Sequence, residues 1–129
     1  MTDPRYTKLA CLLVRYSTKI RKGDIALLDM TDVPDEFAIE LMREVRHAGG
    51  TPLIEVRHTR VTREILRGTD ERHAALVRDL EMFRMKKVQA YIAIRGSGNA
   101  NENADVPAKL LSLYSRTLRA RDLNWIALE

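Results

Sequence analysis

Residues 91–107 of the chain read YIAIRGSGNANENADVP, and this stretch decides the fold class. It begins with an apolar run that predicts a buried strand, and it continues through Gly, Ser and Asn. It closes on Asp-Val-Pro, a sequence typical of a helix start. In an open α/β sheet, ligands bind where the chain leaves the carboxyl end of a strand. The stretch therefore predicts a strand, a contact loop and a helix.

The loop within this stretch supplies the candidate site residues. We expect residues 95–104 to lie on the surface at the carboxyl edge of the sheet, facing a substrate or a second domain. The loop has no His or Cys and only one Glu, so it predicts contact and no catalytic residue. The residues proposed for this substrate-side or domain-contact role are Arg95, Gly96, Ser97, Gly98, Asn99, Asn101 and Glu102.

Helical and strand patterns alternate outward from this stretch. Apolar residues at steps of three and four predict helices at about residues 4–22, 34–48 and 70–87 and from residue 105, with a short turn at residues 62–68. Continuous apolar runs predict strands at residues 25–28, 53–56, 90–94 and 124–128. The residues expected to form the buried helix faces are Leu9, Leu12, Leu13, Tyr16, Ile20; Phe37, Ala38, Leu41, Met42, Val45; Leu76, Val77, Leu80, Phe83; and Leu110, Leu111, Tyr114, Leu118.

Strict alternation of helix and strand predicts an α/β fold with three layers. Continuous apolar strands indicate a mostly parallel sheet that is covered on both faces by helices. We expect one domain over residues 1–129, with four strands in the order 2-1-3-4, as in Rossmann-like and flavodoxin-like folds.

Composition favours a soluble globular chain. The 129 residues are 45% hydrophobic and 31% charged, and the net charge of +4 is spread among interleaved acids and bases. This distribution argues against a nucleic-acid surface. No apolar run approaches the roughly 20 residues that span a bilayer, and the N-terminus lacks signal-peptide order. With Cys11 as its single cysteine, we expect a cytoplasmic protein without membrane contact.

Metal and acidic-pocket chemistry is not predicted within this chain. The three histidines, His47, His58 and His73, are far apart and fall on different predicted elements, whereas metal ligands converge. Asp24, Asp29 and Asp32 flank the first strand as in a receiver domain, but the other strands exit as Arg-His and Arg-Gly. Helix caps and turns explain these acids better.

Nucleophilic and dinucleotide sites are also disfavoured. Ser97 stands in Gly-Ser-Gly, which is not the G-x-S-x-G elbow, and no His follows it. Gly96 and Gly98 follow the third strand, and Asn101 replaces the last Gly of G-x-G-x-x-G. We interpret these residues as loop structure.

Three stretches together resemble the N-terminal domain of the M29 family of metalloaminopeptidases, of the aminopeptidase T and S type. They are residues 9–28, residues 45–56 and residues 90–129. The most specific pieces are the run from Tyr16-Ser17 to Lys22-Gly23-Asp24 and the pattern N-x-N-E-x-x-D-V-P at 99–107. The resemblance implies an exopeptidase that removes N-terminal residues with two divalent metal ions (Zn, Co or Mn). Its ligands belong to a C-terminal catalytic domain, so this chain holds neither metal nor catalytic residue. The implied partners are that metal-binding domain, a peptide substrate and a second copy in a homodimer.

One alternative stays open. A stand-alone, non-enzymatic α/β domain would bind a small ligand or protein partner through residues 95–104. The sequence stops on a strand, so we expect either a piece of a longer protein or a domain made to meet a partner, and Leu128-Glu129 also fits a tag junction. We expect an exposed apolar surface near the last strand and fourth helix, self-association, and no peptidase activity of this chain alone.

Overall fold

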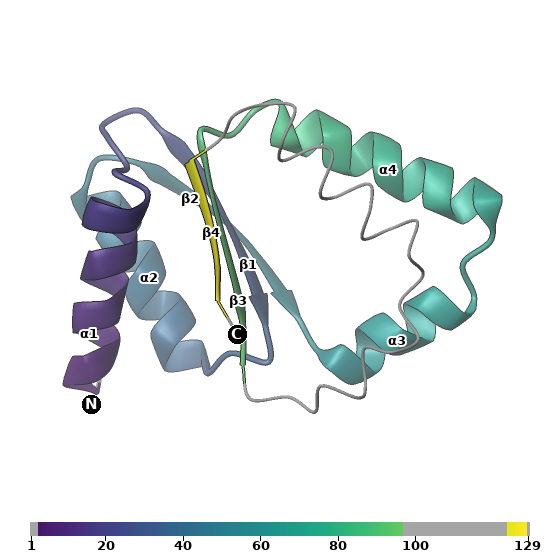
Figure 1. Ribbon diagram of the computed structural model, residues 1–129, viewed down its shortest axis with the longest axis horizontal. Helices are drawn as coiled ribbons and strands as arrows, with labels where there is room; N and C mark the ends of the chain where they lie inside the picture. The colour runs from purple at the N-terminus through teal and green to yellow at the C-terminus, as the bar shows by residue number, and fades with distance from the viewer. Residues whose placement is uncertain (1–2, 97–123, 129) are drawn as a thin grey trace.

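The computed structural model describes residues 3–96 in full and residues 124–128 as backbone (Figure 1). In the described residues the chain opens with two helical segments, one helix connects β1 to β2, and two consecutive helices connect β2 to β3. In order, the elements are α1 (Pro4–Cys11), the π-helix η1 (Leu12–Ser17), β1 (Ile25–Thr31), α2 (Asp35–His47), β2 (Thr51–Arg57), α3 (Thr59–Arg67), α4 (Glu71–Met85), β3 (Ala90–Arg95) and β4 (Asn124–Leu128).

β1 lies in the middle of a parallel sheet. It pairs with β2 on one side and β3 on the other, so that Leu28 stands between Ile54 and Ile92. The backbone of β4 pairs in parallel with β3, and the strand order is β2-β1-β3-β4. The predicted α/β class and the parallel sheet of β1, β2 and β3 are confirmed. The predicted fourth helix, from residue 105, lies outside the described residues.

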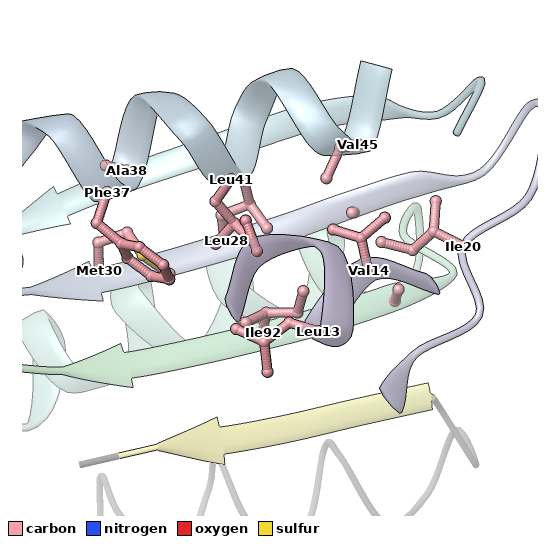
Figure 2. Packing of buried hydrophobic residues seen from close by; sticks show 13 residues of the cluster. Leu13, Val14, Ile20, Leu28, Met30, Phe37, Ala38, Leu41, Val45 and Ile92 are labelled. Carbon is pink, nitrogen blue, oxygen red and sulfur yellow. The ribbon is translucent and has the colours of Figure 1, made fainter. Parts of the chain in front are cut away.

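The first face of the sheet carries the main core, between the strands and α1–α2. Helix α2 begins with two acids and ends with Arg46 and His47, the charge order that the helix dipole favours. Its Phe37 ring meets the ring of Tyr6 edge-on, with centroids 5.3 Å apart. The buried residues of this core, ten of them labelled in Figure 2, are Ala10, Leu13, Val14, Ile20, Ala26, Leu28, Met30, Phe37, Ala38, Leu41, Val45, Ala90 and Ile92.

The first helix ends at Ser17, before the predicted end at residue 22. The buried Thr18 hydroxyl donates to the Leu13 carbonyl at 2.8 Å, and Lys19 takes a left-handed conformation with φ 51°. The Ile20 amide then bonds the Val14 carbonyl at 3.0 Å. The helix thus ends where the Thr18 side chain and the residue after the left-handed Lys19 bond its last carbonyl groups. Apolar spacing alone does not predict such an end.

The buried stripe of this helix also differs from the prediction. Leu13 and Ile20 are buried as expected, but Leu9, Leu12 and Tyr16 are 38%, 50% and 69% exposed. The residues that join Leu13 in the core are Ala10 and Val14. The prediction followed the largest side chains, whereas the face that joins the core carries the smaller Ala10 and Val14 beside Leu13.

The second face of the sheet carries α3 and α4, on the side opposite α1 and α2 (Figure 1). The predicted short turn is instead the nine-residue helix α3. The predicted buried face of α4 is wrong, because Leu76, Leu80 and Phe83 are 58%, 62% and 67% exposed. Among the described residues, this face buries only a small cluster of Leu27, Met85, Val88 and Tyr91.

No helix in the part of the chain that the structure describes has the length and apolar character needed to cross a membrane.

Candidate binding site at the carboxyl edge of the sheet

The ends of three parallel strands meet at one edge of the sheet. β1 exits through Thr31 and Asp32, β2 through Arg57 and His58, and β3 through Arg95. The connection from β1 leads to one flank of the sheet and the connection from β3 to the other. Such a reversal of direction is where open α/β sheets form a ligand crevice.

Asp32 joins the exits of β1 and β2. Its Oδ1 accepts the Thr59 amide at 3.2 Å, and its Oδ2 accepts a short hydrogen bond from the Thr59 hydroxyl. The Asp32 amide donates to the Arg57 carbonyl at 3.0 Å. Asp32 adopts φ 54°, the left-handed region that non-glycine residues seldom occupy. These bonds hold the side chain over the first residue of α3, where a carboxylate suits the helix dipole.

The environment lowers the pKa of the Asp32 carboxyl group below its ordinary value. The Thr59 hydroxyl bond is the main cause, and burial opposes it. The Thr59 amide and the charges of His58 and Arg95 lower this pKa further. His58 lies beside the same carboxylate, with Nδ1 3.8 Å from Oδ1, and its side chain is 69% exposed. Asp32 is therefore held as a carboxylate between two basic side chains.

Gly96 is required where β3 leaves the sheet. Its amide donates to the Thr31 carbonyl at 2.7 Å, which brings the two strand exits together. A Cβ at this position would lie 1.9 Å from the Asp32 carbonyl oxygen, so any side chain would displace backbone. A glycine is therefore needed at this position for the exits of β1 and β3 to approach so closely.

The structure describes two of the candidate loop residues. Arg95 is the last residue of β3, and Gly96 follows it at the carboxyl edge. Ser97, Gly98, Asn99, Asn101 and Glu102 lie outside the described residues.

The sequence prediction missed the cluster of Asp32, His58 and Thr59. The sequence indicates only a helix cap or a turn for Asp32, and the structure shows that its side chain caps α3, 27 positions further along the chain. Pro34 holds the N-cap position of α2, without a side-chain bond. The sequence did contain a signal for this cluster. Asp32 and His58 each follow a predicted strand directly, and parallel strands end at the same edge of a sheet.

The remaining histidines and acids occupy separate places. His47 lies near the end of α2, with Nδ1 3.8 Å from Glu44 Oε1. The His73 amide donates to Asp70, which caps α4 at 2.8 Å, and Asp24 accepts the Arg21 amide in a turn at 2.9 Å. Within residues 3–96 and 124–128, no group of three His, Cys, Asp or Glu residues could hold a metal ion.

Asp29 belongs to an ionic network beneath α4. Its Oδ1 accepts Arg57 Nε at 2.9 Å, and its Oδ2 accepts the Tyr91 hydroxyl at 2.8 Å. These bonds run across β1, β2 and β3, in the part of β1 that continues past its predicted end at Leu28 to Thr31 and pairs there with both neighbours.

Arg84 connects this network to α4. Its guanidinium bonds Glu81 one helical turn back, at 2.5 Å, and makes a short contact with Glu55 on β2. Arg57 also makes a short contact with Glu55 and lies 3.9 Å from Glu81. Burial alone would lower the pKa of Arg84, but the two carboxylates raise it above its ordinary value. Paired charges thus bind the C-terminal half of α4 to the sheet.

Comparison with known proteins identifies a solved structure with a similar fold. That structure is similar to 95% of this chain, with a TM-score of 0.64. The fold is similar to that of AmpT from Thermus thermophilus. The identity is 16%, so the similarity shows the fold alone, and it agrees with the M29-like fold that the sequence motifs imply. This chain spans 35% of the AmpT chain. No family model matches, and no curated protein matches.

Proposed function

We propose that this chain is the non-catalytic N-terminal domain of a two-metal-dependent aminopeptidase. The observation that carries the proposal is the similarity of 95% of the chain to about a third of AmpT, at a TM-score of 0.64. The M29-like motifs at residues 9–28, 45–56 and 90–129 support the same reading. The complete protein would release N-terminal residues from peptides, act in the cytoplasm and assemble as a homodimer.

The proposed fold is a four-stranded parallel sheet covered by helices on both faces. The backbone pairing of β4 with β3 supports its fourth strand. In an open parallel sheet, ligands and partners meet the carboxyl ends of the strands. The carboxyl edge would then face the catalytic domain, with residues 95–104 beside the peptide.

The described residues do not fit a two-metal centre. Two-metal hydrolysis needs several carboxylate or imidazole ligands that converge on ions roughly 3.5–4 Å apart. The described part of the carboxyl edge brings together Asp32, already bonded to Thr59, and His58. We therefore place the two divalent ions (Zn, Co or Mn) in the C-terminal domain and assign no catalytic step to this chain.

Peptidase assays on two lengths of the protein test the proposal. The first sample is the chain 1–129, and the second is the product of the longest native reading frame that contains it. Each is incubated with an aminoacyl p-nitroanilide and Zn²⁺, Co²⁺ or Mn²⁺, with the N-acetylated substrate as the control that lacks a free amine. We expect metal-dependent release by the longer product only, abolished by chelator, and no shift in the Tm of chain 1–129 with metal.

Two outcomes would contradict the proposal. Metal-dependent hydrolysis by chain 1–129, lost in His58→Ala, would show that this domain is itself catalytic. A native reading frame that ends with this chain, or a longer product that is inactive with all three metals, would favour the stand-alone binding domain.

A further inference from the structure

Arg95 is a half-buried cation without a bonded counter-ion among the described residues. It ends β3 at the edge where the ligand crevice is expected, and it lies on the same strand face as Tyr91 and Ala93. Among the described residues, Arg95 is attracted electrostatically to Asp32. It makes no hydrogen bond and no ion pair within 4 Å with any of them. A guanidinium in this setting is stabilised by an anion that can accept its fork of N–H donors.

Asp32 does not form a hydrogen bond or an ion pair with the guanidinium of Arg95. Both Asp32 oxygens accept hydrogen bonds from Thr59, and His58 lies beside Oδ1. Its carboxylate is therefore oriented toward the start of α3 and does not form a bidentate pair with Arg95. His58 places a second cation at this edge when its imidazole is protonated. The edge thus offers donors for one more anion.

We propose that Arg95 binds the free C-terminal carboxylate of a short peptide. The choice of ligand rests on the proposed function, since an exopeptidase substrate held near the carboxyl edge carries a carboxylate at its far end. Guanidinium and carboxylate match as two parallel N–H···O bonds, so the contact would select peptides by length and by a free C-terminus. Arg95 acts here as a specificity-determining residue, distant from the bond that is cleaved.

Binding to chain 1–129 is measured by NMR, independently of hydrolysis. The probe is N-acetyl-Ala-Ala, and its C-terminal amide is the matched control that differs only in charge. We expect the acid to shift the Arg95 Nε–Hε and Gly96 amide signals, and the amide to bind roughly 10-fold more weakly, the loss expected for one charge-assisted contact. Inorganic phosphate is titrated separately as a second anion.

Variants assign the effect to Arg95. Arg95→Gln should weaken binding of the acid roughly 10-fold, and Arg95→Lys should weaken it less because the charge is kept without the fork. Arg43→Gln is the control, since Arg43 is an exposed arginine of α2 that pairs with Glu40 at 3.8 Å. It should leave binding unchanged. Signal dispersion and Tm confirm that each variant is folded.

These experiments test the carboxylate site and the proposed function independently of each other. Equal binding of acid and amide, unchanged binding in Arg95→Gln, or binding of phosphate but not of the acid would overturn the carboxylate site. Peptidase activity of the longer product would stand in each case. Selective binding of the acid by a protein that never hydrolyses peptides would keep the site and reject the aminopeptidase.

Discussion

The two faces of the sheet are covered by different chemistry. In the described residues, the α1–α2 face buries thirteen apolar residues in one cluster, whereas the α3–α4 face buries four. The second face instead holds Arg57 and Arg84 among three carboxylates, and α3 is attached at its start through Asp32. Large apolar side chains on α4 point away from the small cluster and are exposed.

This difference bears on stability and on function. Apolar burial is not weakened by the ionic screening that salt provides, whereas partly exposed ion pairs weaken as salt rises. The α1–α2 face should therefore stabilise the domain, and the α3–α4 face should be the layer that responds to conditions and partners. Substitutions on the two faces test this division.

The largest expected effect compares neighbours on one strand. Leu28 and Leu27 are both buried on β1 but point to opposite faces, into the large and the small cluster. Leu28→Ala should cost about 2–5 kcal/mol of unfolding free energy, because a cavity opens in a close-packed core. Leu27→Ala should cost less, since the thinner cluster can relax around it. Urea unfolding measures both, and equal losses would refute the contrast.

The next effect concerns the strand exit beside α3. Gly96→Ala places a Cβ against the Asp32 carbonyl and should destabilise the protein by about 1–3 kcal/mol. Gly68 is the matched control, because a Cβ there meets nothing within 4 Å and its φ is −95°. Gly68→Ala should be neutral or slightly stabilising. Thermal unfolding compares the two, and a neutral Gly96→Ala would show that the edge yields easily.

The ionic network should contribute a smaller, salt-sensitive amount. Arg84→Met removes one of the two arginines that pair with Glu55 and Glu81 and should cost about 1–2 kcal/mol, less than for a fully buried pair. Arg43→Met, at an exposed arginine of α2 that lies 3.8 Å from Glu40, should cost at most about 0.5 kcal/mol. The Arg84 effect should shrink at high salt. A loss that is independent of salt would indicate packing as the cause.

The bond between Thr59 and Asp32 should appear in the pH dependence. Thr59→Val removes the hydroxyl donor, so the pKa of Asp32 should rise toward its ordinary value. Because the folded pKa is depressed, this bond stabilises above the unfolded pKa of about 3.9, and its contribution is lost as pH falls through the folded value. The variant should be about 1 kcal/mol less stable at neutral pH and approach the wild type in acid. Carboxyl ¹³C titration follows Asp32 directly, and an unchanged pKa would contradict the assignment.

The smallest expected effect concerns the exposed side of α4. Leu80→Ser should change the unfolding free energy by less than about 0.5 kcal/mol, because the side chain is already 62% exposed. It should reduce the self-association that we predict for the isolated chain. Light scattering at increasing concentration measures this, with Lys86→Ser as a polar control. Unchanged association would locate the contact elsewhere.

The order of elements in the described chain was readable from sequence because it depends on local patterns. Of the five residues predicted to be buried on α2, Phe37, Ala38, Leu41 and Val45 are buried and Met42 is half-buried, and apolar spacing, acidic start and basic end agree on this helix. β2 extends over Thr51–Arg57, and Pro52 is tolerated because β2 lies at the edge of the sheet. Consistent local signals predict an element and its core face well.

Periodicity was insufficient on α4. Leu76, Leu80 and Phe83 share one side of the helix, as the spacing predicts, but that side does not contact the described core. Spacing shows which residues lie together on a helix, and only the packing of the layers shows which side is covered. The polar contacts of Arg84 oriented this helix, and a hydrophobic pattern does not detect them.

The sequence by itself determined the α/β alternation, the parallel sheet and the glycine at the exit of β3. Hydrophobic periodicity and local turn residues decide these features. Only the tertiary structure decided that Asp32 caps α3, that Arg84 holds α4, and that Arg95 stands without a bonded counter-ion in the described edge. These contacts join residues that are distant in the chain. They exist only once β1, β2 and β3 align their carboxyl ends at one edge, and no local pattern encodes that closure.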